Sequence, residues 1–67
     1  MVSMDIETEQ QRIAGFVEKG NFHAAINLAI SAMNACRREH DQAGVDHFLT
    51  VIDDIVARMR ERYGSRG

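Results

Sequence analysis

Cys36 and His40 are the first pair of residues whose types and spacing could carry out chemistry. They lie four positions apart, so on a helix they share one face and could supply two zinc ligands, with His47 or Asp41 as further donors. A structural zinc site needs four well-placed ligands, and the chain has neither a CxxC nor an HExxH motif. We therefore expect no metal site, with Cys36 a small buried hydrophobe and His40 a solvated residue at a helix end.

The adjacent carboxylates Asp53 and Asp54 are the second candidate. Consecutive helical residues point about 100° apart, so these two cannot share a catalytic site within one chain. We interpret them as a solvated face, and His23 as a surface histidine. The chain has no nucleophile–base arrangement and no glycine-rich phosphate loop. The sequence therefore predicts a protein that is not an enzyme and needs no cofactor.

The charged residues are unevenly distributed. Residues 1–57 carry four Lys/Arg against nine Asp/Glu, whereas the last ten residues carry four arginines and one glutamate. Arg58, Arg60 and Arg62 are candidate contacts to an acidic protein partner, and nucleic acid is the alternative. The plainest interpretation is that these arginines, with Arg66 beyond them, interact favourably with the helix dipole and keep the chain soluble. The net charge of the chain is −2, whereas typical nucleic-acid-binding domains are basic, so a nucleic-acid partner is disfavoured.

The length of 67 residues limits the chain to one domain. A chain of this size buries only about 60% of its unfolded surface, so it usually recruits disulfides, a metal or a second subunit. The single cysteine excludes a disulfide within the chain, which leaves oligomerisation. There is no apolar run of about 20 residues and no secretory signal pattern. We expect a cytoplasmic protein with no membrane contact.

A helix is predicted over residues 5–19, with Ser3 or Asp5 as its N-cap. Gly20 then fits the left-handed position that ends a helix. Asn21 fits the cap of a second helix over residues 22–40. This second helix is apolar around most of its circumference, which indicates that it is surrounded by protein.

The third helix is predicted over residues 44–63, and it has the clearest amphipathic pattern in the chain. Its apolar stripe comprises Val45, Phe48, Ile52, Ile55 and Met59, and is broadened by Leu49, Val56 and Tyr63. Asp41 could cap a helix starting at Gln42, or Gly44 could end a helix, and the sequence leaves both open. Either connection is short, so the second and third helices should pack antiparallel. The fold class is all-α: two or three helices in an antiparallel hairpin, within a dimeric helical bundle.

Residues 20–32 resemble the second half of a tetratricopeptide repeat. Gly20, Phe22, Ala25, Ala29 and Ala32 match that family's turn glycine, aromatic residue and spaced alanines. This resemblance implies a close-packed hairpin of the first two helices. The chain is also similar, in length and overall design, to small helical phage proteins that inhibit host regulators. That second resemblance implies an inhibitor or anti-activator.

These observations favour a homodimer that binds another protein and modulates it, with inhibition as the expected effect. A small DNA-associated regulator using the C-terminal arginines, and a structural subunit of a larger assembly, are the alternatives. The predicted dimer or partner interface consists of Phe22, Ile26, Leu28, Ala29, Met33, Phe48, Ile52, Ile55 and Met59. The second or third helix is expected near the two-fold axis.

Overall fold

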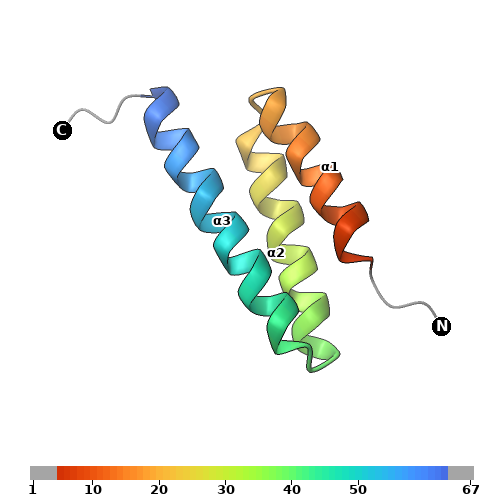
Figure 1. The fold of residues 1–67 in the computed structure, drawn as a ribbon. Helices are drawn as coiled ribbons and strands as arrows, with labels where there is room; N and C mark the ends of the chain where they lie inside the picture. The colour runs from red at the N-terminus through yellow and green to blue at the C-terminus, as the bar shows by residue number, and fades with distance from the viewer. Residues whose placement is uncertain (1–4, 64–67) are drawn as a thin grey trace.

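Three helices make up the structure, a computed structural model that describes residues 5–63. They are α1 (Ile6–Glu18), α2 (Phe22–Arg38) and α3 (Gln42–Tyr63), and the described part of the chain contains no strand. The all-α prediction is therefore confirmed. α2 packs against both α1 and α3, whereas direct contact between α1 and α3 is slight. Figure 1 shows the resulting arrangement, with α2 between the other two helices.

Asp5 caps α1 with its side chain. Its carboxylate accepts a hydrogen bond from the backbone N–H of Glu7 (3.2 Å) and another from the hydroxyl of Thr8 (2.8 Å). The hydrogen bond from Thr8 favours the ionised carboxylate and so lowers the pKa of Asp5. The alternative cap, Ser3, lies outside the described residues. α1 is one residue shorter at each end than the predicted range 5–19.

Gly20 ends the first helix as its sequence predicts. Its φ angle of +79° places it in the left-handed region, where glycine has no steric penalty. The N–H of Asn21 donates to the carbonyl of Phe16 (2.9 Å), which completes a Schellman turn. The side chain of Asn21 then accepts from the N–H of Ala24 (3.3 Å) and starts α2.

The turn between α2 and α3 repeats this design without a glycine. His40 takes the left-handed position at φ +59°, and the N–H of Asp41 donates to the carbonyl of Cys36 (2.8 Å). The side chain of Asp41 accepts from the N–H of Gly44 (3.0 Å), so Asp41 is the cap of α3. α3 therefore begins two residues before the predicted start at 44. α2 ends before the predicted limit of the range 22–40, because His40 has left the helical conformation.

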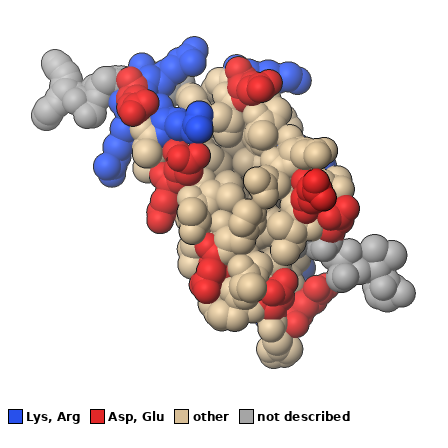
Figure 2. Space-filling model, in the orientation of Figure 1, with Lys and Arg blue, Asp and Glu red and all other residues tan. Residues whose placement is uncertain are grey.

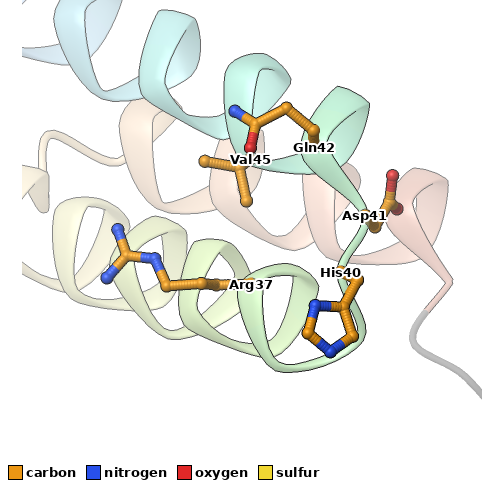
Figure 3. Close-up of a pocket in the computed structure, with 5 residues that line it drawn as sticks. All are labelled: Arg37, His40, Asp41, Gln42 and Val45. Atoms are coloured by element: carbon orange, nitrogen blue, oxygen red, sulfur yellow. The ribbon is translucent and has the colours of Figure 1, made fainter.

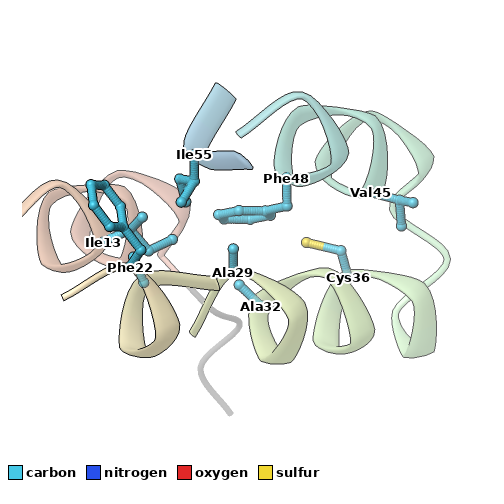
Figure 4. Close-up of a cluster of buried hydrophobic side chains, with 9 residues drawn as sticks. Ile13, Phe22, Ala29, Ala32, Cys36, Val45, Phe48 and Ile55 are labelled. Atoms are coloured by element: carbon cyan, nitrogen blue, oxygen red, sulfur yellow. The ribbon is translucent and has the colours of Figure 1, made fainter. Parts of the chain in front are cut away.

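The core lies along the faces of α2 that meet the other two helices (Figure 4). Ala25, Ala29 and Ala32 are buried in the middle of α2, where small side chains let the neighbouring helices approach. Phe48 and Ile55 of α3 are the two largest fully buried side chains among the described residues. The buried set comprises Ile13, Phe22, Ala25, Ala29, Ala32, Cys36, Val45, Phe48 and Ile55. A search of the described helices finds none whose length and hydropathy would let it cross a membrane.

Candidate interaction surfaces

Cys36 and His40 lie in different surroundings in this fold. Cys36 is 2% exposed, and Figure 4 shows its sulfur turned into the core toward Phe48. Burial raises the pKa of its thiol, and the carboxylate of Asp41 adds to the effect. His40 lies exposed on the turn. Over residues 5–63, no three His, Cys, Asp or Glu side chains come close enough together to hold a metal ion.

The paired aspartates are solvated, as expected from their positions. Asp53 and Asp54 are both exposed. Asp54 accepts a hydrogen bond at 3.1 Å from Nε of Arg58, one turn further along α3, and both side chains are more than half exposed. An ion pair this open to water contributes little to stability.

A polar hollow lies at the corner where α2 meets α3 (Figure 3). Its lining consists of Arg37, His40, Asp41, Gln42 and Val45. The side chains of Arg37 and His40 extend in different directions in Figure 3 rather than toward a common point. The side chain of Asp41 is already engaged in capping α3. The hollow therefore has no converging set of reactive groups.

A groove runs between α1 and α3, on the side of the molecule where these helices do not pack together. We call it the inter-helix groove; its volume is about 460 Å³. Its lining consists of Gln10, Ile13, Ala14, Val17 and Glu18 from α1 and Thr50, Val51, Asp54, Ile55 and Arg58 from α3. Ile13 and Ile55 are buried beneath it, and Val17 and Val51 are half-buried. Figure 2 shows an uncharged strip along this face, with acidic side chains on either side.

One hydrogen bond joins α1 and α3 next to the inter-helix groove. His47 of α3 and Gln10 of α1 approach to 2.8 Å between Nε2 and Oε1. The imidazole also meets the ring of Phe48 edge-on, with centroids 5.0 Å apart. This contact fixes the spacing of α1 and α3 at one end while the rest of the groove stays open. The groove thus has an apolar floor and a defined width.

A second apolar surface lies on the opposite side of the α2–α3 pair. Leu49 is 45% exposed and Ile30 is 39% exposed, and these are the two large hydrophobic side chains most open to solvent among the described residues. Ile30 lies seven positions before Arg37, on the face of α2 that borders the start of α3. Leu49 is turned about 160° around α3 from Val51, away from the inter-helix groove. We call this surface the outer edge.

The predicted interface residues fall into two groups. Phe22, Ala29, Phe48 and Ile55 belong to the core of the single chain, which leaves them almost no surface for a partner. Ile26, Leu28, Met33, Ile52 and Met59 are only partly buried against that core. Amphipathic spacing identifies the apolar side of a helix but does not tell which part of that side its own chain covers.

The inter-helix groove and the outer edge also include residues that the sequence does not predict as part of an interface. Ile30, Leu49 and Val51 were absent from the predicted interface, although each lies beside a selected residue on its helix. The signal that could have found Leu49 was already present: Leu49 and Val56 extend the stripe of α3 on one side. The width of that stripe exceeds what a single neighbouring helix can cover.

The C-terminal arginines do not form a single basic face. Arg58, Arg60 and Arg62 are all exposed. Because α3 turns about 100° per residue, Arg60 points about 160° away from each of the other two around the helix axis. Arg58 is already paired with Asp54. Arg66 lies outside the described residues.

Comparison with known proteins gives no further guide to function. No protein-family model matches the chain, and no curated protein or solved structure is significantly similar to it. The resemblance of residues 20–32 to a tetratricopeptide hairpin, and the likeness to phage inhibitors, therefore stay predictions.

Proposed function

We propose that the chain is a non-enzymatic protein–protein interaction module. It acts as a homodimer and binds a second protein, whose activity it modulates by covering a surface, so that inhibition is the simplest outcome. The observation that carries this proposal is the inter-helix groove, whose apolar floor lies open between α1 and α3. Small chains rarely leave two apolar surfaces in water unless other molecules cover them.

The shape and lining of the groove favour a protein ligand. It is an open channel between two helices, with aliphatic side chains below and polar side chains such as Gln10 and Thr50 along its walls. Such a channel suits an amphipathic helix or an extended segment, which can place apolar residues on the floor and polar residues at the rim. The outer edge is then free to contact a second copy of the chain.

The alternative of a DNA-associated regulator has weaker support. Arg58 and Arg62 share one face of α3, whereas Arg60 lies on another, and Arg58 is already paired with Asp54. A duplex contact would make binding fall steeply with salt, whereas an apolar groove would be nearly insensitive to it. A titration with duplex DNA at two salt concentrations therefore separates these two functions.

The proposal is tested by affinity capture from the native cell with matched variants. Ala14 is exposed on the wall of the groove, so Ala14→Arg fills the channel without disturbing the core. Asn27→Arg introduces the same charge on the polar face of α2, away from the groove, and serves as the control. We expect a protein that is retained by the wild type and by Asn27→Arg but lost by Ala14→Arg. Equal retention by all three would refute the role of the groove.

A further inference from the structure

α3 carries a second apolar seam beside the one that packs on α2. The inner seam contains Phe48 and Ile55, which are buried. The second seam, which we call the outer seam, contains Val45, Leu49, Ile52, Val56 and Met59. Its spacing of four, three, four and three residues is that of a helix that packs along a partner helix. Leu49 is exposed, and Ile52, Val56 and Met59 are half-buried, so α2 covers this seam only in part.

The outer seam is self-complementary when one copy is reversed against another. With Ile52 on a two-fold axis, Leu49 of one copy lies opposite Val56 of the other. Val45 is buried within its own chain, so the exposed part of the contact is the pair of Leu49–Val56 layers on either side of Ile52. Ile30 of α2 lies exposed on the same edge and would widen the contact.

The charges of α3 select the antiparallel arrangement. Residues 42–57 contain three aspartates and no Lys or Arg, whereas residues 58–62 contain three arginines and one glutamate. Parallel copies would bring acidic half against acidic half. In the antiparallel arrangement Asp46 of each copy lies beside Arg60 of the other, so the two-fold axis produces this contact twice. Neither Asp46 nor Arg60 forms an ion pair with another described residue of its own chain.

We infer that the outer seam binds a second copy of this chain, with the two α3 helices antiparallel and Ile52 near the two-fold axis. This inference rests on the homodimer in the proposed function and specifies its geometry. α3 has 22 residues, so it is about 33 Å long and the strip that it offers covers roughly 350 Å² in projection. Two such strips bury roughly 700 Å² in total, which is below the roughly 1,000 Å² of stable interfaces, so a weak dimer that dissociates in the upper micromolar range is expected.

Charge reversal tests the pairing in sedimentation equilibrium at low salt. Asp46→Arg and Arg60→Asp should each raise the dimer dissociation constant about tenfold or more, because two symmetry-related contacts become repulsive together. The double variant should recover most of the wild-type affinity. Arg62→Asp makes the same change of charge on another face of α3, and should leave the dimer intact.

The same arrangement places the two copies of Asp53 near each other at the axis. Asp53→Asn should therefore tighten the dimer severalfold, since it removes a repulsion between like charges. One result overturns the inference: the wild-type chain dimerises, but neither single charge reversal changes the dissociation constant and the double variant recovers no affinity. In that case the homodimer stands and only its geometry is wrong.

A cross-linking experiment reports the orientation directly. Asp46→Cys and Arg60→Cys chains, mixed and oxidised, should form a disulfide mainly between the two different chains if α3 is antiparallel. Cys36 is buried, so it does not compete. Disulfides mainly between identical chains would contradict the antiparallel contact. A wild-type chain that is monomeric throughout the micromolar range would instead remove the homodimer itself, and with it this inference.

Discussion

Two glycines inside helices should respond in opposite ways to the same substitution. A Cβ at Gly15 of α1 would meet nothing within 4 Å, so Gly15→Ala should gain the usual advantage of alanine in a helix, about 1 kcal/mol. A Cβ at Gly44 of α3 would lie 2.5 Å from Sγ of Cys36 and 2.7 Å from Oδ2 of Asp41. Ordinary contacts between such atoms are about 3.5–4 Å, so the helices must move apart there.

Overpacking of this kind costs about 1–3 kcal/mol, which outweighs the helical gain of about 1 kcal/mol. Gly44→Ala should therefore lower the free energy of unfolding by about 1 kcal/mol, and Gly15→Ala should raise it by about the same amount. In a domain of this size each change corresponds to about 4–8 °C in Tm. Thermal and urea denaturation followed by circular dichroism, at one protein concentration, would measure both changes.

The double variant Cys36→Ala with Gly44→Ala identifies the cause. Removing Sγ vacates the space that the new methyl group needs, so the two changes together should be less destabilising than the sum of their separate effects. If Gly44→Ala stabilises the protein as much as Gly15→Ala does, then α2 and α3 do not approach as closely as described. The reasoning would then be refuted.

Three further outcomes follow from the described contacts. His40→Gly should raise the free energy of unfolding by about 0.5–1 kcal/mol, measured by urea denaturation, because glycine has no penalty at φ +59°. The pKa of Asp5 is lower in the folded state, so its capping contribution is complete above the unfolded pKa and is lost as pH falls through the folded pKa. The protection of the Glu7 amide against hydrogen exchange, measured relative to the intrinsic rate at each pH, should accordingly fall in acid, and Asp5→Asn should remove that fall. Ile52→Asp should unfold or monomerise the protein, whereas Leu49→Asp, at a position 45% exposed, should give a folded monomer by circular dichroism and light scattering.

Much of the fold could be predicted from local chemistry. Gly20 and Asn21 mark the first turn with residue types that suit their conformations, and the structure confirms both. The second turn has no such glycine, and because any residue other than glycine is uncommon at a left-handed position, the sequence pattern predicts His40 within the helix. Asp41 and Gly44 were both plausible boundaries until the capping hydrogen bond between them decided the start of α3.

The candidate surfaces were harder to predict than the helices. Periodicity indicates which residues of α3 are apolar, but it does not tell whether Phe48 or Leu49 faces α2. The structure buries Phe48 and leaves Leu49 exposed, because α2 lies against one side of the stripe only. The inter-helix groove depends on the slight contact between α1 and α3, which are far apart in the sequence. Such a tertiary feature has no local sequence signal.

Sedimentation equilibrium of the wild-type chain is the most direct test of the claim that a partner covers these apolar surfaces. The chain has a mass of 7.5 kDa, so a homodimer gives a species of about 15 kDa at micromolar concentrations, which dissociates on dilution. Leu49→Asp, measured beside it, should remain at the monomer mass. A wild-type chain that is folded and monomeric at every concentration would contradict the account.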